Sequence, residues 1–407
     1  MSYIPPHLRV SNSRQKSCRE APCFSSSGGN LHARNRELVP DVRIVKSAGF
    51  VSRLIVSCSQ LVKFDKFEGE TFAHLQQHQL YILEAADKAS GSEEIYEGSL
   101  QEPPPRHIVG LLQEEITRVL EKFKELACAK NAGRVVPLMW LEFGKVLFHN
   151  RSVSLEEHRS FTPKEVEMMS GGGREVYKTF DNGVSRENFS LLQRCAKKNS
   201  LQSWSNERYA IQVSDEARPN THLWCVCAYS KGDEHTTLAS RESTKLALTL
   251  LKVKLIPIRY LISDVAFVGK SYDIRLKFFT KNYLTALSEE ESEDLEACLS
   301  KASIDHSAKG GLRWPLGSKQ STSGRFKVVG SVHQMKEFFV DSRLRWSLKR
   351  CNRVEFKASS GRISYEVSVR PNVYHKFCKA QEDRAVEELM SSVADTIQEV
   401  WEECVES

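Results

Sequence analysis

The sequence predicts an α+β fold dominated by antiparallel sheet, which can be barrel-like, with flanking helices and a C-terminal amphipathic helix. Three observations lead to this class. Several segments alternate apolar and polar residues, as half-buried strands do. A few segments carry apolar residues at helical spacing, and the strands come in runs rather than alternating with helices. With 407 residues, 40% of them hydrophobic and 27% charged, the chain can bury a sizeable core.

Residues 1–38 form the first predicted region, a disordered basic arm without apolar periodicity. An Arg- and Ser-rich start that is poor in acids is also typical of transit peptides, but Pro5 and Pro6 disfavour a helix at the very start. Eleven scattered cysteines without a disulfide framework indicate a reducing compartment. We therefore expect the cytoplasm or the nucleus, with the mitochondrion or plastid as the alternative.

Three further regions follow along the chain. Residues 39–90 are a small strand-rich segment, residues 91–105 an acidic linker that ends in prolines, and residues 106–407 the main α+β domain. The main domain opens with a helix, because Ile108, Leu112, Ile116, Leu120 and other apolar residues recur at helical spacing.

The middle of the chain mixes strands and short helices. Residues 137–149 predict a strongly apolar strand pair or one bent strand, with Gly144 as the bulge. Residues 161–170 predict a helix capped by Thr162, and residues 186–198 predict another helix. Two strands, 208–215 and 222–229, are joined by a turn-forming segment and predict a hairpin.

The last third is mainly strand. Residues 271–280 alternate, and a short acidic helix starts at Ser288. The segments 324–332, 338–350, 352–358 and 362–370 then predict an antiparallel meander. The chain closes with an amphipathic helix, whose apolar face begins at Val386 and whose other face is acidic.

Basic residues on the alternating strands near the carboxyl end are the main candidate binding residues. They are Arg343, Arg345, Lys349, Arg353 and Lys357. Three interpretations stay open. The face is solvated, with charges paired across strands; or it binds RNA phosphates; or it lines the inside of a closed barrel, as in tunnel-type triphosphatases. The third interpretation needs two Glu-x-Glu strands, whereas Glu142, Glu355 and Glu366 stand singly.

The segment 309–330, KGGLRWPLGSKQSTSGRFKVVG, adds Arg313 and Trp314. It is not a phosphate-binding P-loop, because a serine stands where the lysine is required and a strand follows instead of a helix. One interpretation is a connection in which Gly310 and Gly311 end the preceding helix and Trp314 packs on the core. The other is an Arg–Trp pair that stacks on single-stranded nucleic acid.

Catalytic, metal-binding and cofactor-binding motifs are not evident. The histidines, including His306 and His333, are scattered, and no nucleophile elbow or zinc-binding spacing of cysteines occurs. We therefore expect no catalytic residues, no metal, no cofactor and no membrane span. The net charge of +6 is compatible with an RNA partner but does not require one.

The first nine residues, MSYIPPHLR, form a short extended segment with Tyr3, Pro5, Pro6 and Arg9 as docking residues. This segment resembles a stretch near the N-terminus of some DEAD-box RNA helicases, where it is associated with binding a cap-binding translation factor. Together with FGKVLFH, VSDEARPN and GGLRWPLG, it is similar to an uncharacterised plant protein family with a domain of unknown function. The resemblance implies a plant source and one long α+β domain, and it brings no known reaction.

The function expected from the sequence is that of a non-enzymatic binding protein associated with RNA or a ribonucleoprotein. The alternatives are a phosphate-handling enzyme built on a charged antiparallel barrel and a scaffold that binds only protein, through the acidic face of the last helix.

Overall fold

A computed structural model describes fourteen stretches of the 407-residue chain and a few residues near its end. The stretches are 51–58, 60–68, 79–86, 104–128, 135–149, 159–171, 176–198, 200–217, 222–230, 247–254, 258–284, 287–314, 325–356 and 360–371. Four further residues, Ser391, Ala394, Asp395 and Gln398, are helical. The predicted basic arm, most of the acidic linker and most of the C-terminal helix lie outside these residues.

Eight antiparallel strands are joined by hydrogen bonds into a ring. In chain order they are β4 (Val135–His149), β6 (Gln202–Asp215), β7 (His222–Ser230), β8 (Ala247–Lys254), β10 (Asp273–Leu284), β13 (Phe326–Val340), β14 (Leu344–Glu355) and β15 (Ser360–Pro371). The pairing order is β10, β8, β7, β6, β13, β14, β15 and β4, and β4 pairs again with β10. Among the described residues, the β10–β8 and β15–β4 junctions are short, so the ring is only partly joined at these two places.

The remaining strands extend the sheet from two members of the ring. Strand β9 (Ile258–Phe267) pairs with β10, and β1 (Val51–Ser57) pairs with β9 in parallel. Strands β3 (Tyr81–Ala85) and β5 (Tyr177–Asp181) pair with β4, and β2 (Val62–Lys66) pairs with β3. The strand-rich segment predicted at 39–90 therefore supplies strands to the same sheet as the rest of the chain.

The helices lie outside the ring, and each begins where the sequence provides a start signal or an apolar stripe. They are α2 (Pro104–Cys128), α3 (Pro163–Gly171), α4 (Arg186–Lys198) and α5 (Glu289–Leu299). Ser288 caps α5 by accepting a hydrogen bond from the Glu291 amide, and the Glu291 side chain accepts one from the Ser288 amide. None of the described helices is long and apolar enough to cross a membrane.

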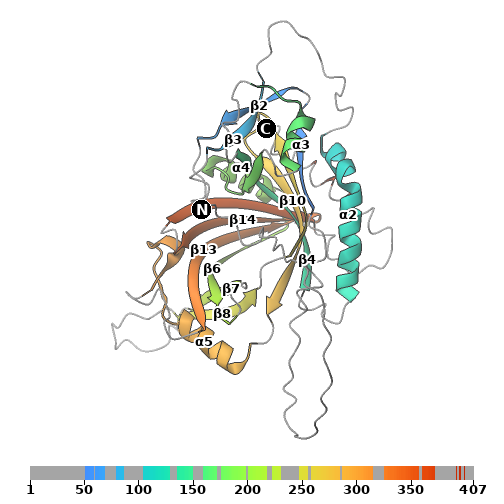
Figure 1. The fold of residues 1–407 in the computed structure, drawn as a ribbon. Coiled ribbons are helices and arrows are strands. Elements are labelled where there is room, and N and C mark those ends of the chain that lie inside the picture. Colours follow the sequence, from blue (N-terminus) through green and yellow to red (C-terminus); the bar gives the residue numbers. More distant parts are fainter. Residues whose placement is uncertain are drawn as a thin grey trace, which may run out of the picture. The chain divides into compact units, whose positions relative to one another are not determined.

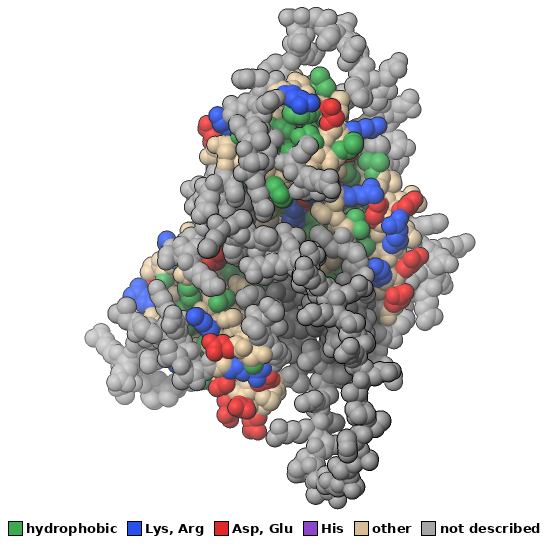
Figure 2. Space-filling model, in the orientation of Figure 1, with side chains coloured by type: hydrophobic (Ala, Val, Ile, Leu, Met, Phe, Trp, Pro, Cys, Tyr) green, Lys and Arg blue, Asp and Glu red, His purple; other side chains and the backbone are tan. Residues whose placement is uncertain are grey.

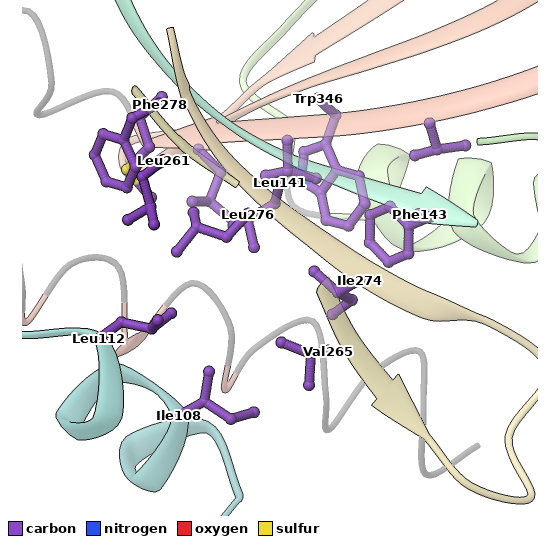
Figure 3. Packing of buried hydrophobic residues seen from close by; sticks show 14 of the residues in the cluster. Ile108, Leu112, Leu141, Phe143, Leu261, Val265, Ile274, Leu276, Phe278 and Trp346 are labelled. Atoms are coloured by element: carbon purple, nitrogen blue, oxygen red, sulfur yellow. The ribbon is translucent and has the colours of Figure 1, made fainter. Parts of the chain in front are cut away.

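The largest apolar core lies on the outer face of the ring, where α2 covers one part (Figure 1) and Leu192 and Ala196 of α4 cover another. Ile108 and Leu112 of α2 face Val265 of β9 and Ile274 of β10 (Figure 3). On the C-terminal strands, Trp346 and its alternate neighbours Leu344 and Leu348 belong to the same core. Because side chains alternate along a strand, the residues between them face the interior of the ring.

Two further cores cover other parts of the sheet. One joins β1, β2, β3 and β5 to α3, with Phe64, Phe148 and Phe161 at its centre. The other lies between α5 and the outer face of β6, β7 and β13, and it includes Leu295 and Tyr209. The cores under α2 and under α5 lie on the outer face of the ring, whereas the core around Phe148 lies on the face of β4 that also carries Glu142.

Several expectations need correction. Strands β8 and β9 were not predicted, and residues 344–355 form one strand rather than parts of two. Gly310 and Gly311 do not end a helix, because α5 ends at Leu299; they form the short 3₁₀ helix η2 (Lys309–Gly311), both with positive φ. No register shift occurs at Gly144, where instead a Cβ atom would lie 2.0 Å from the Asp181 carbonyl oxygen.

Candidate anion-binding site

The interior face of the ring carries a set of basic side chains that come from five different strands. They are Lys254 of β8, Lys281 of β10, Lys336 of β13, Lys349 of β14 and Arg370 of β15. We call these five residues the cation cluster. Lys336 lies directly opposite Lys349 in the β13–β14 register. Since the outer faces of these strands pack under helices, the cluster faces inward.

The charges in the cluster act on one another across the ring. Burial lowers the pKa of Lys281 to about 6. Repulsion adds to this lowering, and it comes from cations on four other strands: Lys254, Lys349, Lys336 and Arg370. The side chains therefore converge on one space, although they come from two separate groups of neighbouring strands, β8 with β10 and β13 to β15.

Lys254 and Lys336 show the same effect. Burial, together with repulsion from neighbouring cations, lowers the pKa of Lys254 to about 8 and that of Lys336 to about 7. Within the described part of the chain, no acid forms an ion pair with Lys254, Lys281 or Lys336. Buried ammonium groups without an acid partner have an uncompensated cost, which a bound anion would offset.

Aromatic rings form part of the same surface. The Lys281 ammonium lies 4.3 Å from the centre of the Trp140 ring, and the Lys349 ammonium lies 5.4 Å from it. At the β13–β14 hairpin end, the Arg345 guanidinium lies 4.9 Å from the Trp204 ring centre and 4.8 Å from that of Phe338. Cation–π contacts hold these side chains in place without neutralising their charge.

Two buried carboxylates face the interior beside the cluster. Glu366 of β15 pairs with Lys349 at 3.5 Å and with Arg353. Burial opposes its ionisation, but the two cations prevail and lower the pKa of Glu366 to about 2. Glu142 of β4 pairs with Lys277 of β10. Both acids are thus already matched to cations.

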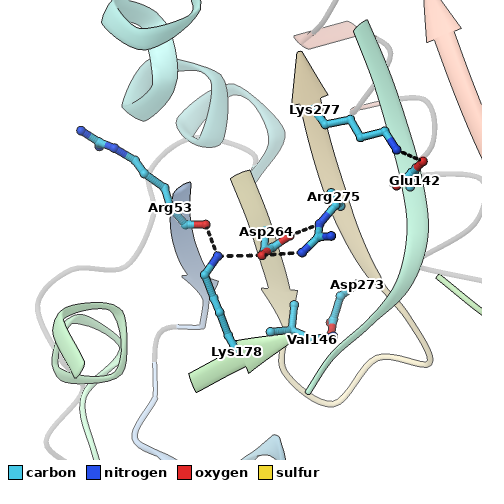
Figure 4. Close-up of polar contacts among 8 residues, drawn as sticks. All are labelled: Arg53, Glu142, Val146, Lys178, Asp264, Asp273, Arg275 and Lys277. Atoms are coloured by element: carbon cyan, nitrogen blue, oxygen red, sulfur yellow. Dashed lines mark hydrogen bonds and ion pairs between the residues drawn. The ribbon is translucent and has the colours of Figure 1, made fainter. Parts of the chain in front are cut away.

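Next to Lys277, charged side chains of β5, β9 and β10 form ion pairs with one another. Asp264 of β9 is buried and accepts two hydrogen bonds from Arg275 and one from Lys178, with distances from 2.6 to 3.1 Å (Figure 4). Burial opposes ionisation, yet these two cations keep the pKa of Asp264 below its usual value. This part of the sheet is neutralised from within, which distinguishes it from the cation cluster.

The outside of the molecule has the opposite character over part of its surface. Asp and Glu side chains gather over α5, whereas acidic and basic side chains alternate along α2 (Figure 2). Helix α5 alone has the sequence EEESEDLEACL. An anion would therefore be repelled by this outer surface and attracted by the interior of the ring.

The basic residues predicted on the C-terminal strands lie partly on the interior face of the ring and partly in a turn. Arg345, Lys349 and Arg353 face the interior, where Lys349 and Arg353 pair with Glu366. Of the three interpretations that the sequence left open, the pairing of the strands favours the one in which these cations point into the ring. Arg343 is exposed in the β13–β14 turn, where its amide donates a hydrogen bond to Asp341.

Arg313 and Trp314 do not form a free stacking surface. Arg313, at the end of β12 (Leu312–Arg313), pairs with Asp305 at 2.6 Å. Trp314 packs against Phe356, with ring centres 5.5 Å apart, beside the core under α5. The four residues predicted to bind a partner, Tyr3, Pro5, Pro6 and Arg9, lie outside the described residues, as does Lys357.

Lys254, Lys281 and Lys336 were missed from the sequence, and Arg370 was placed on the polar face of its strand but not selected as a candidate. Strand β8 was not predicted at all, and Lys281 and Lys336 lie beyond the ends of the predicted strands. The period-two pattern identifies which residues share a face, but it does not say which way the sheet curves.

Solved structures with a similar arrangement of strands include RNA triphosphatases. The RNA triphosphatase Pct1 of S. pombe, in complex with the Spt5 CTD, has a TM-score of 0.40 at 9% identity, covering 72% of this chain and 92% of that chain. The mimivirus capping enzyme triphosphatase has a TM-score of 0.32 at 9% identity, covering 71% and 97%. The PH1819 protein of Pyrococcus horikoshii OT3 has a TM-score of 0.24 at 8% identity, covering 54% and 86%.

At this level of similarity, the function has to be argued from the residues of the site. Among curated proteins, none matches the chain. One family model, described as "Domain of unknown function (DUF7903)", matches residues 42–404. This match spans the ring and the strands predicted as a separate segment, and the chain therefore belongs to the DUF7903 family.

Proposed function

We propose that this protein binds an oligophosphate group, such as the triphosphate of a nucleotide or of an RNA 5′ end, inside the ring of strands. The observation that carries the proposal is the cation cluster. It combines several inward-facing basic side chains, depressed lysine pKa values and a lack of acid partners among the described residues for Lys254, Lys281 and Lys336.

An oligophosphate fits this cluster better than a single phosphate does. The cations come from five strands, so they surround a space rather than mark one point, and a chain of phosphates can contact several of them at once. The nearby rings of Trp140 and Trp204 offer flat surfaces on which a base can stack. The bound phosphate chain can be part of an RNA molecule, and the proposal is therefore compatible with the RNA partner expected from the sequence.

Binding is favoured over hydrolysis as the first function. The two interior carboxylates described above, Glu142 and Glu366, are each already paired with a cation. A metal ion that assists phosphoryl transfer usually needs uncommitted carboxylates.

Calorimetric titration with sodium tripolyphosphate tests the proposal. The wild-type chain is compared with Lys281→Met, Lys336→Met and the double variant, and with Lys197→Met as the control. Lys197 is an exposed lysine of α4 and carries the same charge outside the ring. We expect each interior variant to weaken binding at least about tenfold, because each removes a charge-assisted contact of about 1.5–3 kcal/mol, while Lys197→Met leaves it unchanged.

Two further measurements sharpen this test. Binding should take up protons near pH 7.5, because a bound anion restores the charge of Lys281 and Lys336, whose pKa values of about 6 and 7 leave them mostly neutral in the empty site. Titrations in buffers of different ionisation enthalpy measure this uptake. The affinity should also increase from orthophosphate to pyrophosphate to tripolyphosphate. Equal binding by the double variant and by Lys197→Met would contradict the proposal.

A second candidate function, hydrolysis of the bound phosphate chain, is favoured by one observation. Glu366 lies two residues from Ser368, which is opposite Glu142, so the two carboxylates share a face on neighbouring strands. If the protein has this function, it should release orthophosphate from tripolyphosphate in the presence of Mg²⁺ or Mn²⁺. The variants Glu142→Gln and Glu366→Gln should lose this activity. If the wild-type chain binds tripolyphosphate but releases no orthophosphate, hydrolysis is contradicted and binding remains as the function.

A further inference from the structure

A second cluster of polar side chains lies outside the ring and is independent of the cation cluster. It consists of Glu207 of β6, His333 of β13 and His306, which follows β11 (Ser303–Ile304). Glu207 and His333 alternate with the inward-facing Arg208 and Gln334, so they are on the outer face of the sheet. This is the same face on which Tyr209 joins the core under α5.

The three side chains are close together and point at one another. The Nε2 atom of His333 lies 2.6 Å from Oε1 of Glu207, and the Nδ1 atom of His306 lies 3.8 Å from the same oxygen. The two imidazole rings are 5.3 Å apart between centres and are inclined to each other by 54°. One ligand atom from each residue fits within 4.8 Å of the others.

Each residue is held by the fold in a different way. His333 is 8% exposed and stacks on Tyr209, with ring centres 4.8 Å apart, so its ring cannot turn freely. Glu207 is opposite Met335, on the strand that carries His333. The His306 side chain is 61% exposed, which leaves the cluster open to solvent on one side.

The loop that carries His306 is tied to the sheet by its own hydrogen bonds. The amide of Asp305 donates to the Gly311 carbonyl, and the amide of Gly311 donates to the Ala308 carbonyl. Asn352 of β14 accepts from the Gly310 amide and donates to the Ala308 carbonyl. These hydrogen bonds hold the loop on both sides of His306, at Asp305 and at residues 308–311.

Gly311 explains how the loop approaches so closely. Its φ is +73°, and a Cβ atom there would lie 2.6 Å from the Cβ atom of His333. The glycine pair of the segment 309–330 thus brings the His306 loop directly against the His333 side chain. This role was not evident from the sequence, where the pair was expected to end a helix.

We propose that Glu207, His306 and His333 bind a transition-metal dication, with Zn²⁺ as the preferred ion. Two imidazoles and one carboxylate are a common set of three protein ligands for Zn²⁺, with water or another ligand in the fourth position. Imidazole nitrogens exclude Mg²⁺ and Ca²⁺ as the preferred ions, because these take oxygen ligands.

The distances fit an ion after small shifts. Bonds of 2.0–2.2 Å in a tetrahedral site put ligand atoms about 3.3 Å apart. The separations of Glu207 from His333 and from His306, 2.6 and 3.8 Å, are on either side of this value. Side-chain rotation of Glu207 and of the exposed His306 supplies the adjustment, while His333 stays stacked on Tyr209.

The competing explanation is that Glu207 only satisfies a buried histidine. It accounts for the His333–Glu207 contact, but it gives no reason for His306 to lie over both side chains. Among the described residues, this is also the one group of three His, Cys, Asp or Glu side chains close enough to hold an ion.

Titration of the full-length chain with Zn²⁺ and Co²⁺ tests the site. The protein carries no affinity tag and is first treated with a chelator. Wild type is compared with His306→Gln and Glu207→Gln, and with His149→Gln as the control, since His149 is a half-buried histidine on another strand. His306→Gln is the decisive variant, because its exposed side chain can be changed without disturbing a core.

We expect one Zn²⁺ site tighter than about 10 μM, equivalent to roughly −7 kcal/mol. His306→Gln and Glu207→Gln should weaken it at least about tenfold, and His149→Gln should leave it unchanged. Bound Co²⁺ should show ligand-field bands without a thiolate charge-transfer band, which separates this site from one formed by cysteines.

A thermal-unfolding measurement provides a second readout. Zn²⁺ should raise the melting temperature of the wild type and of His149→Gln but not that of His306→Gln, because an ion that binds only the folded state stabilises it. The proposal is overturned if the wild type binds no Zn²⁺ below this limit, if His306→Gln binds as tightly as the wild type, or if a thiolate band accompanies binding.

Discussion

Lys281 shows how the position of a single residue determines its chemistry. It lies on the interior face of β10, against the Trp140 ring and within reach of four other cations. An ordinary lysine keeps its proton to about pH 10.4, whereas burial lowers the pKa of Lys281 to about 6. The fold therefore holds this amine mostly neutral near pH 7.5 unless an anion is bound.

This arrangement makes stability depend on pH. In the folded state, Lys281, Lys336 and Lys254 lose their protons with pKa values of about 6, 7 and 8, whereas in the unfolded state they lose them near 10.4. Between these values the unfolded chain binds more protons, so the free energy of unfolding rises with pH. The slope is up to about 1.4 kcal/mol per pH unit for each lysine.

Urea denaturation at pH 6.5 and pH 8 measures this slope. We expect the wild type to be more stable at pH 8 and the Lys281→Met variant to gain less over the same interval. The interval stops at pH 8 because burial raises the pKa of the Cys225 thiol. Above that pH the thiol ionises first in the unfolded chain, which lowers the free energy of unfolding as pH rises. Equal slopes in the two proteins would contradict the assignment.

Two glycines with positive φ provide another test at the residue scale. Gly311 (φ +73°) lies against His333, whereas Gly269 (φ +75°) has no atom within 4 Å of an added Cβ. Gly269→Ala should cost about 1–2 kcal/mol, from backbone strain alone. Gly311→Ala should cost roughly 1–3 kcal/mol more because of the clash. Denaturant unfolding of both variants compares them directly, and equal losses would show that the loop is not packed as described.

At the scale of elements, α5 shows that local sequence signals can be sufficient. Ser288 and Glu291 form a capping box, as their spacing suggests. Replacing Ser288 with Ala should reduce the free energy of unfolding by about 1 kcal/mol. Ser292→Ala, inside the same helix, should have little effect. A chemical-denaturation comparison that finds no difference between the two would show that the cap contributes nothing.

Strands were harder to predict than helices, for physical reasons. Strand β9 has the burial of an interior strand over most of its length, so its sequence lacks the alternation that identifies a half-buried strand. The pairing of β7 with β8 contains a register shift at Val226/Cys227, and the pairing of β9 with β10 contains one at Phe278/Phe279. A shift of one residue exchanges the two faces of a strand, and it cannot be read from one sequence.

The candidate sites were even less accessible. The cation cluster is formed by ring closure, which brings together residues from Lys254 to Arg370. The proposed metal ligands Glu207 and His333 are 126 positions apart, and His306 comes from a separate loop. Alternation predicts that Arg345 and Lys349 share a face, but the curvature that turns this face inward depends on contacts with β4 and β10.

At the scale of the whole molecule, the first strands are part of the fold. Leu54, Ile55 and Val56 of β1 are buried, and β3 pairs with β4. Residues 48–407 form one compact unit. A chain that starts at residue 104, close to the predicted start of the main domain, would expose the apolar residues that β1, β2 and β3 cover.

Truncation checks this conclusion. We expect a chain of residues 48–407 to unfold cooperatively with a melting temperature close to that of the full chain. A chain of residues 104–407 should aggregate or lack a cooperative transition, because an uncovered core is a large exposed apolar surface. A folded, monomeric 104–407 chain, judged by calorimetry and size-exclusion chromatography, would show that the first strands are dispensable.

The interior of the ring also has a consequence for handling the protein. Where ammonium groups crowd together without matching acids, they either lose protons or take up an anion from the surrounding solution. Purified material should consequently retain small anionic solutes picked up from the cell or from phosphate buffer. Their identity, read by mass spectrometry of the denatured supernatant, offers a direct route from this lumen to its natural occupant.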